Sequence, residues 1–346
     1  MPYRIGSFNV KNLSYGNKDR DLDGIAKLIK KFDIVALQEV LSEGKILYGP
    51  DMKNVVGQAK AYERSLMRRL GSGWEAAWCA PISRANDSPF LGEDTRGEGY
   101  VFLWRTDKFM LPKDKDGKEI KPSIFKAYNL VEEGMVRLIR EPAYGRFVVK
   151  GTQGAIGRPV EIRLITTHII FGKPKINNLN VEIEHGSIVM RKNEFKILAG
   201  QIYNRINENQ RDIHCKAIYT LLLGDYNLNL PTSSVGNALI SDVTCFDKFG
   251  RSIPLKMKEA TDRVVYTVQD KLTTVKFEQA GYANNYDHFT FDDSGNDKMR
   301  KEVVKGVNRM DAVNLLYKSE KDEDEKFKRY RSEISDHVPV MILLDC

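Results

Sequence analysis

The chain has 346 residues, of which 42% are hydrophobic and 29% are charged. This composition is typical of a globular protein and excludes a collagen-like or wholly disordered chain. No apolar run approaches the ~18 residues that a membrane span needs, so no membrane span is expected, and no membrane partner is predicted. Lysine and arginine (54) exceed aspartate and glutamate (47) by seven charges, which favours a polyanionic partner without requiring one. Length alone suggests two domains at about 150 residues each.

The four cysteines, Cys79, Cys215, Cys245 and Cys346, show no CxxC spacing. Their pattern fits incidental thiols in a reducing compartment better than a zinc site or a disulfide framework. The first ten residues lack the basic segment and apolar stretch of a signal peptide. We therefore expect a cytoplasmic protein, with a mature domain trimmed from a precursor as the alternative.

Strand-like and helix-like segments alternate through the first half of the chain. The sequence predicts strands at Tyr3–Val10, Asp33–Val40, Trp74–Ala80 and Tyr100–Arg105, and helices at Asp21–Phe32 and Lys53–Leu70. In the first helix, Ile25, Leu28, Ile29 and Phe32 recur at the spacing of one helical face. The polar segment Pro112–Pro122 is typical of a turn at a hairpin tip.

The second half continues the alternation. The sequence predicts strands at Arg146–Lys150, Pro159–Thr167, Lys216–Leu223, Val264–Gln269, Tyr286–Phe291 and Val338–Leu344. A long helix is expected over Val181–Asn209, and Asp297–Arg331 is expected to be helical, with Lys318–Arg331 as a solvated face. We find no internal repeat and no low-complexity linker. The pattern favours an α/β or α+β class in which helices cover sheets.

Polar side chains stand where the apolar strands end. They are Asn9, Glu39, His168, Asp225, Asn227, Asp287, Asp336 and His337. Loops leave a sheet at strand ends, which is the usual place for a functional site. Oxygen donors suit a hard cation such as Mg²⁺, and histidines carry protons near neutral pH. Together these groups match phosphate-ester hydrolysis, in which a metal offsets phosphoryl charge while other groups activate water and protonate the leaving oxygen.

Other polar residues are expected to have only structural roles. Asp21 and Asp33 fit helix caps or turn residues, because that is what most aspartates at element ends do. His185 and His214 fit surface or satisfied core positions. Asp287 and His288 alternate on one strand, so only one of them can face the site, and we favour Asp287.

Five short motifs resemble, in this order, those of the endonuclease/exonuclease/phosphatase superfamily. They are SFNVKNL with Asn9, VALQEV with Glu39, TTH with His168, GDYN at 224–227 and SDH at 335–337. GEGYVFLWR at 97–105 and REPA at 140–143 are similar to the deoxyribonuclease I branch. The resemblance implies an α+β fold, a four-layer α/β/β/α sandwich of two packed, mostly antiparallel sheets flanked by helices. It also implies one domain over residues 1–346, with a charged insert at about 297–331.

The resemblance implies a metal site and a phosphate site. Glu39, Asp336 and Asn9 would hold the metal ion, which would be Mg²⁺ with Mn²⁺ as a substitute. Arg140 would clamp the scissile phosphate, because a planar guanidinium can bond two oxygens at once. Asn9 and Asn227 would bind the same phosphate.

The catalytic set that the resemblance implies comprises His168, His337, Asp287, Glu98, Asp225 and Asn227. His168 would protonate the leaving oxygen and would be steadied by Glu98. His337 would activate water and would be oriented by Asp287. The sequence leaves open an assignment in which the two histidines exchange roles.

Resemblance and net charge together favour a metal-dependent endonuclease acting on DNA, with weak sequence specificity and with 5′-phosphate and 3′-hydroxyl products. The residues do not distinguish RNA from DNA, and no aromatic platform for single strands is evident. Leu41 stands near the place where the deoxyribonuclease branch has a basic groove-contacting residue. Arg96, Lys53 and Arg300–Arg309 are candidates for that contact.

Two other functions are alternatives to a DNA endonuclease. A phospholipid or phosphoinositide phosphoesterase needs a membrane-seeking loop, but loops 41–57 and 84–97 contain no aromatic hairpin. A non-catalytic binding module predicts a broken site, whereas every expected catalytic position is filled here. The sequence does not indicate an oligomeric state.

Overall fold

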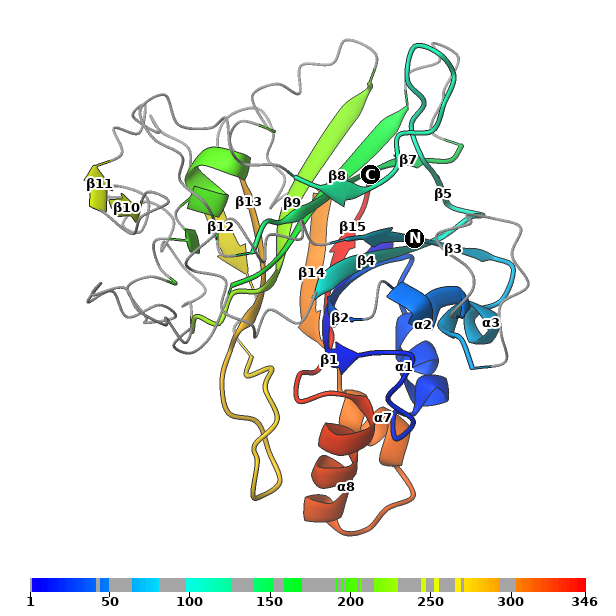
Figure 1. Cartoon of the computed structure of the whole chain (residues 1–346), viewed down its shortest axis with the longest axis vertical. Helices are drawn as coiled ribbons and strands as arrows, with labels where there is room; N and C mark the ends of the chain where they lie inside the picture. Colours follow the sequence, from blue (N-terminus) through cyan, green and yellow to red (C-terminus); the bar gives the residue numbers. More distant parts are fainter. Residues whose placement is uncertain are drawn as a thin grey trace.

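Two β-sheets pack face to face in the computed structural model, and helical segments cover them (Figure 1). The structure describes residues 2–41, 44–49, 64–80, 98–125, 138, 140–151, 159–169, 191, 194–195, 197–203, 206, 215–229, 244–246, 252–254, 265–268, 271–292 and 303–346. This arrangement confirms the predicted α+β sandwich. None of the helices among these residues is long and apolar enough to cross a membrane.

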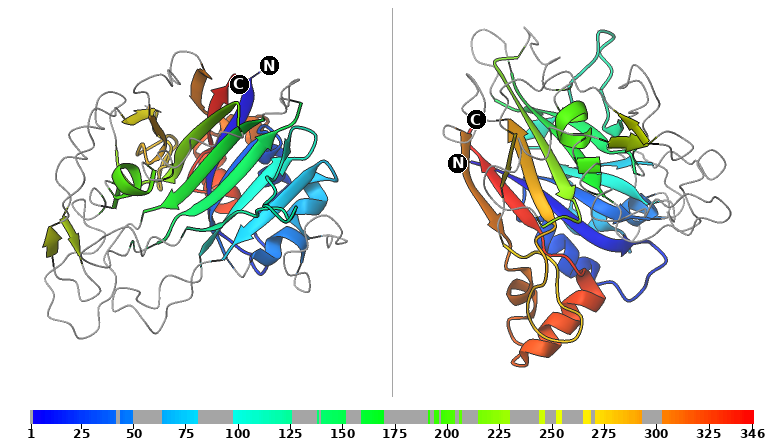
Figure 2. Two further views of the ribbon diagram at one scale, coloured as in Figure 1. Left: turned by 90° about the horizontal axis from the view of Figure 1, so that it is seen from above. Right: turned by 90° about the vertical axis from the view of Figure 1, so that its left-hand side faces the viewer.

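The first sheet has the strand order β14-β15-β1-β2-β4-β3. Its strands are β1 (Tyr3–Leu13), β2 (Ile34–Val40), β3 (Trp74–Cys79), β4 (Gly99–Arg105), β14 (Val304–Arg309) and β15 (Val340–Leu344). The central pair β1 and β2 is parallel, and the other neighbours are antiparallel. Because β1 pairs with β15, the first and last strands of the chain lie side by side (Figure 2).

The second sheet has the order β12-β13-β9-β8-β7-β5, and β6 also pairs with β7. Its strands are β5 (Phe109–Met110), β6 (Ser123–Ile124), β7 (Ala143–Val149), β8 (Val160–His168), β9 (Ala217–Asp225), β12 (Val265–Val268) and β13 (Asp287–Asp292). Here β8 and β9 form the parallel central pair. A separate ribbon joins β10 (Thr244–Phe246) to β11 (Ser252–Pro254).

Side-chain alternation along β1 and β2 creates two cores. Ile5, Ile34 and Ala36 face the second sheet, where they join Leu164 and Leu223 in the larger core. The intervening residues of these strands pack against the helix layer in the second core. Successive strand residues point to opposite faces, so two apolar faces of one sheet need cover on both sides.

In the part of the chain that the structure describes, the helices and other helical segments are short. They are α1 (Leu22–Ile29), α2 (Lys45–Tyr48), α3 (Leu66–Leu70), α7 (Ala312–Tyr317), α8 (Glu323–Arg329) and the π-helical segments Leu198–Tyr203 and Tyr330–Ile334. Asp21 caps α1 by accepting from the Gly24 N–H, as predicted. Asp33 has a structural role of another kind, since it is fully buried and pairs with Arg4 and Lys108.

The segment predicted to be helical near the C-terminus is only partly so. Val304–Arg309 forms the edge strand β14, and helices begin only at Ala312. The charged run is also less solvated than predicted, because Phe327 and Tyr330 are buried in the second core. For two predicted helices, residues 53–63 and most of 181–209 lie outside the described part of the chain.

Candidate active site

Four polar side chains stand at the carboxyl ends of the four central strands. Asn9 lies on β1, Glu39 on β2, His168 on β8 and Asp225 on β9. The Asn9 amide nitrogen donates to Glu39 Oε1 (2.8 Å) and to Asp225 Oδ2 (3.0 Å). The second bond runs from one sheet to the other, so the packing of the sheets brings the four strand ends into one cluster.

Strand register places three site residues in a row across the second sheet. His168 on β8 and Asp287 on β13 both pair with Asp225 on the strand between them. Gly224 makes this close approach possible, since its φ is +146° and a Cβ there would lie 1.9 Å from the Thr167 carbonyl oxygen. The glycine of the GDYN motif is therefore required by the backbone beside it.

Glu39 reaches the site through an unusual backbone conformation. Strict alternation would place it on the same face as Val35 and Leu37, which pack against the helices. Its φ is +59°, which is rare for a residue with a side chain. The carboxylate accepts from Asn9 Nδ2 and from the Asn12 N–H (3.0 Å). These bonds hold a strained residue in place, a feature that is common at active sites.

The SDH segment is tied to β1 at the same edge. Ser335 Oγ donates to the Asn9 carbonyl oxygen (2.7 Å), and the His337 N–H donates back to Ser335 Oγ (3.1 Å). The buried Arg20 donates to the carbonyl oxygens of Val10 and Ile334. The bonds from Ser335 to Asn9 and from Arg20 to Ile334 join residues more than three hundred positions apart. Together with the bond from His337 to Ser335, they fix where His337 enters the cluster.

His337 and Asp287 form a buried pair. His337 Nδ1 lies 2.8 Å from Asp287 Oδ2, and its Nε2 lies 3.5 Å from Asp225 Oδ2. Burial acts to lower the pKa of His337, but Asp287 and Asp225 outweigh it and raise that pKa well above 6.5. The neighbouring His288 instead lies within hydrogen-bond distance of the carbonyl oxygens of Leu228 and Asn285.

His168 faces carboxylates on both sides of its ring. Its Nε2 lies 3.6 Å from Glu39 and 3.7 Å from Asp225, and its Nδ1 lies 3.3 Å from Glu98. Arg140 Nη1 lies 2.7 Å from the same Nδ1, while Nη2 donates to Glu98 (3.1 Å). Arginine can only donate a hydrogen bond, so the bond from Arg140 requires His168 Nδ1 to carry no proton. A hydrogen bond from His168 Nδ1 to Glu98 requires Nδ1 to carry one. Moving Arg140 away would thus favour the His168–Glu98 pair.

The negative charge at the centre suits a divalent cation. Glu39, His168 and Asp225 offer ligand atoms that all lie within 4.8 Å of one another. Burial raises the pKa of Asp225 and repulsion from Asp287 adds to the rise, while His337 and His168 act against it. A cation beside this carboxylate would favour its charged form. Oxygen-rich sites of this kind suit Mg²⁺ or Mn²⁺. A cation held there would stabilise negative charge on a phosphoryl group and lower the pKa of water.

A model of the Endonuclease/Exonuclease/phosphatase family matches residues 6–267. The chain belongs to this family. The fold is similar to that of the mannosyl-6-phosphatase Bt3783 from Bacteroides thetaiotaomicron VPI-5482 (15% identity, TM-score 0.51, 99% of this chain and 100% of that chain). It is also similar to an endonuclease/exonuclease/phosphatase family protein from Bacteroides thetaiotaomicron (15% identity, TM-score 0.50, 99% and 98%). No curated protein matches the chain.

Membership of the endonuclease/exonuclease/phosphatase family makes the chain a phosphoester hydrolase of a class that generally uses a divalent metal ion. The strand-end motifs that suggested this family lie together in the structure. The group whose ligand atoms lie close enough together to hold a metal ion is Glu39, His168 and Asp225, whereas the predicted ligands are Glu39, Asp336 and Asn9. The assignment of individual roles stays a prediction.

Two of the predicted metal ligands have other partners in the structure. The Asn9 amide oxygen accepts from the Lys11 N–H (2.9 Å), and the Asn9 nitrogen faces the carboxylates. Asp336 pairs with Lys11 (3.2 Å) and Arg331 (3.7 Å), and the facing charges of His337, Lys11 and Arg331 overcome burial and lower its pKa. Sequence reasoning missed Lys11 and Arg331. Their only signal is proximity to Asn9 and to the SDH motif in the chain.

Asn227 supports Asp225 from the following turn. Its backbone N–H donates to Asp225 Oδ1 (2.8 Å), and its side chain donates to the Ile169 carbonyl oxygen (2.7 Å). Of the candidate groove contacts, Arg96 and Lys53 lie outside the described residues. Arg309 packs over the Tyr282 ring at 3.8 Å.

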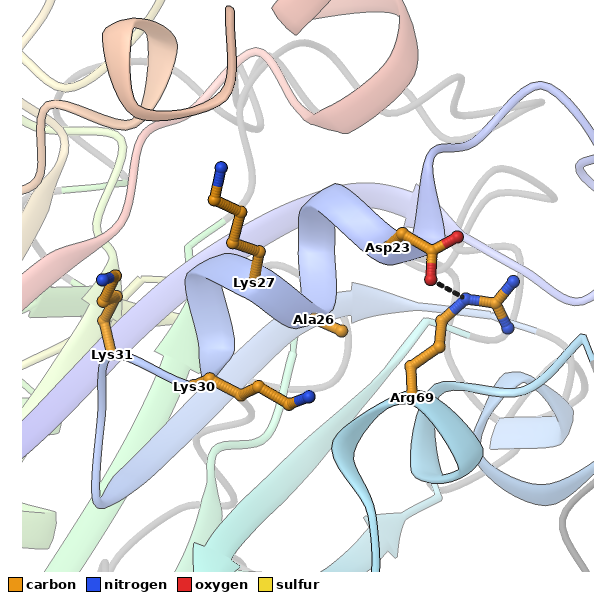
Figure 3. A pocket seen from close by; sticks show the side chains of 6 residues that line it. All are labelled: Asp23, Ala26, Lys27, Lys30, Lys31 and Arg69. Carbon is orange, nitrogen blue, oxygen red and sulfur yellow. Dashed lines mark ion pairs between the residues drawn. The ribbon is translucent and has the colours of Figure 1, made fainter.

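A cavity of about 300 Å³ lies on the helix layer, beside α1 and α3 (Figure 3). It is lined by Asp23, Ala26, Lys27, Lys30, Lys31 and Arg69. Lys30 and Lys31 precede the start of β2, whereas Glu39 lies near its other end, about 17 Å away at ~3.3 Å per residue. This cavity is therefore separate from the strand-end cluster, and its lysines and Arg69 contribute to the net positive charge of the chain.

Proposed function

We propose that this chain is a metal-dependent endonuclease that hydrolyses DNA phosphodiester bonds with weak sequence specificity, leaving 5′-phosphate and 3′-hydroxyl ends. One observation carries the proposal. Two buried histidines lie near the same carboxylate, Asp225: His168 at the end of β8 and His337 in the SDH segment before β15, and each has a second carboxylate of its own. In-line displacement at phosphorus needs a proton acceptor and a proton donor, and the two histidines beside Asp225 would fill these two roles.

The two histidines would divide the proton transfers. His168 would protonate the leaving oxygen, and His337 would activate water while Asp287 fixes its orientation at 2.8 Å. The raised pKa of His337 is also compatible with the exchanged assignment, in which it is the acid. Glu39 and Asp225, with His168 beside them, would bind Mg²⁺ or Mn²⁺. We keep Asn9 and Asp336 as proposed further ligands.

The substrate is expected to be a polyanion because basic side chains surround the cluster. Arg140 lies beside His168, and Lys11 and Arg331 lie beside Asp336. Arg140 would turn to the scissile phosphate, which would leave His168 to Glu98. The net charge of +7 supports contact with a nucleic-acid backbone. A single domain and a cytoplasmic location remain part of the proposal, and the buried thiol of Cys79 agrees with a reducing compartment.

Nicking of supercoiled plasmid by the purified protein tests the proposal. We expect cleavage with Mg²⁺ and none with EDTA. His168→Ala and His337→Ala should each lower the rate by about 10²–10⁴. Lys31→Ala, in the remote cavity, is the matched control and should cleave normally.

Parallel assays with RNA, mannose 6-phosphate and phosphoinositide vesicles address other substrates of this family, one of whose structural neighbours is named a mannosyl-6-phosphatase. If Mg²⁺-dependent hydrolysis occurs only with a phosphomonoester or a lipid, the endonuclease proposal is wrong. Normal nicking by either histidine variant would refute the role given to that histidine.

A further inference from the structure

The segment between β12 and β13, residues 271–286, is attached to the catalytic motif by its backbone. The Val275 N–H donates to the Asp336 carbonyl oxygen (2.7 Å), and the Val338 N–H donates to the Thr273 carbonyl oxygen (2.9 Å). The Asp287 N–H also donates to Thr273 Oγ1 (3.3 Å). We call this segment the 271–286 loop. These bonds keep its position fixed relative to the SDH motif.

The outer part of the 271–286 loop is also held in place. The Lys276 N–H donates to the Gly281 carbonyl oxygen (3.0 Å), which closes the tip. The Tyr282 ring packs edge-on against Phe327 of α8, with ring centroids 5.2 Å apart, and the Ala280 N–H donates to Asp324 (2.6 Å). In Figure 1 the loop accordingly runs down alongside α8. Side chains at its tip therefore project from a supported backbone.

The tip presents an aromatic side chain to solvent. Phe277 is 77% exposed, and the other exposed large apolar residue in the described part of the chain, Leu272 at 42%, lies on the same loop. The Arg331 guanidinium covers the Phe277 ring, with Cζ 4.9 Å from the ring centroid. Arg331 also donates to the Val275 carbonyl oxygen (2.7 Å) and lies 3.7 Å from Asp336. A continuous set of contacts thus leads from His337, through Asp336 and Arg331, to an exposed ring.

We propose that Phe277 and Arg331 form a stacking platform for an unpaired nucleobase next to the scissile phosphate. The inference rests on the proposed nuclease function and deepens it, since it names a single-stranded or locally unpaired nucleic acid as the preferred substrate. Aromatic rings and guanidinium planes bind bases because every base has a π-face. Arg331 stacks and carries positive charge, so it suits both the base and the neighbouring phosphate.

A lipid surface fits this loop less well. Interfacial insertion needs a substantial apolar surface, but Phe277 is flanked by Lys276, Glu278 and Gln279. A base needs only one exposed ring with a cation beside it, which is what the loop offers. The sequence pattern did not reveal the platform, because Phe277 and Arg331 are 54 positions apart and meet only in the fold.

Binding without cleavage separates this inference from the proposed function. Fluorescence anisotropy in EDTA would measure the Kd of a short labelled single-stranded DNA for wild type, Phe277→Ala, Phe277→Trp and Leu272→Ala. We expect Phe277→Ala to weaken binding by about 5- to 100-fold. Phe277→Trp should restore it, and Leu272→Ala, the matched control on the same loop, should bind normally. Fully paired, blunt duplex DNA should bind all four proteins alike.

The outcomes of the two experiments can be told apart. Plasmid nicking by wild type in Mg²⁺ tests the nuclease function, whereas the Kd series tests the platform whatever the result of that assay. Equal affinity of wild type and Phe277→Ala for the single strand would overturn the inference. It would also be overturned if Phe277→Ala abolished sedimentation with phosphatidylcholine–phosphatidylserine vesicles and left DNA binding unchanged, since the loop would then serve a membrane. The melting temperature of each variant checks that folding is intact.

Discussion

Replacing Asp287 by asparagine isolates the contribution of the buried His337–Asp287 pair. Asparagine keeps the size of the side chain but removes the charge that lies 2.8 Å from His337 Nδ1. If His337 transfers a proton, the loss of its orienting partner should lower kcat by about 10²–10⁴. The lost hydrogen bond to a charged group should also lower the free energy of unfolding by about 1.5–3 kcal/mol.

Asp33→Asn is the matched control. Asp33 is equally buried, and it accepts from Arg4 (2.9 Å) and Lys108 (2.9 Å) at the far end of β2 from Glu39. Loss of the Asp33 charge should lower the free energy of unfolding by about 1–3 kcal/mol. The cost stays in this range because the side chains of Arg4 and Lys108 are about one-third exposed, so solvent partly screens the two ion pairs. Nicking activity, measured at a temperature where both variants are folded, should fall only for Asp287→Asn.

The two variants should also differ in how their stability loss depends on pH. The pKa of His337 is raised when the protein is folded, so the contribution of its pair is fully present below about pH 6.5 and is lost as pH rises through the folded pKa. Burial acts to raise the pKa of Asp33, but Arg4 and Lys108 outweigh it and lower that pKa below 3.8. Its contribution is therefore present above about pH 4 and disappears at lower pH.

Urea unfolding in EDTA at several pH values, combined with nicking assays, measures both effects. Equal activity of Asp287→Asn and wild type would refute the reasoning about His337. A stability loss for Asp287→Asn that grows as pH rises above 6.5 would refute the electrostatic account of the pair.

Two further substitutions test the geometry of the site. Gly224→Ala would place a Cβ 1.9 Å from the Thr167 carbonyl oxygen. We therefore expect calorimetry to show a loss of about 1–3 kcal/mol in the free energy of unfolding, and we expect weak nicking activity. Gly73→Ala is the control, because a Cβ at Gly73 would meet no atom within 4 Å and should cost little stability. Glu39→Gln keeps the shape of the side chain but removes a charge from the proposed metal site. This variant should need about tenfold or more Mg²⁺ to reach the same stabilisation of the fold, measured as the rise of the melting temperature with Mg²⁺ concentration. If the Mg²⁺ titration is the same as for wild type, Glu39 is not a ligand of the metal.

Local pattern was sufficient for most of the strands and for the first helix. The apolar runs that became β2 and β8 are bounded by polar residues, and Asp21 caps α1 where predicted. The prediction failed at β14, whose sequence VKGVNR has little alternation of apolar and polar residues. That edge strand forms because β15 offers an open hydrogen-bonding edge, and such an edge exists only in the folded sheet.

The motifs fixed the family, but they did not fix how their side chains meet. Alternation alone would turn Glu39 toward the helices, and the left-handed backbone at this residue directs it to Asn9 instead. Likewise, the sequence shows Asp336 beside His337, but only the fold pairs Asp336 with Lys11 and Arg331. Backbone strain and partners distant in the chain leave no periodic trace in a sequence.

The amino-acid sequence by itself determined most of the elements, the family and the residue types available for chemistry, because these depend on local periodicity and short motifs. Tertiary structure decided which carboxylate lies near both histidines and which exposed ring packs against Arg331. Asp225 became the shared partner through sheet register, and Phe277 came next to Arg331 through loop packing. Both are consequences of contacts between segments far apart in the chain, which no local pattern encodes.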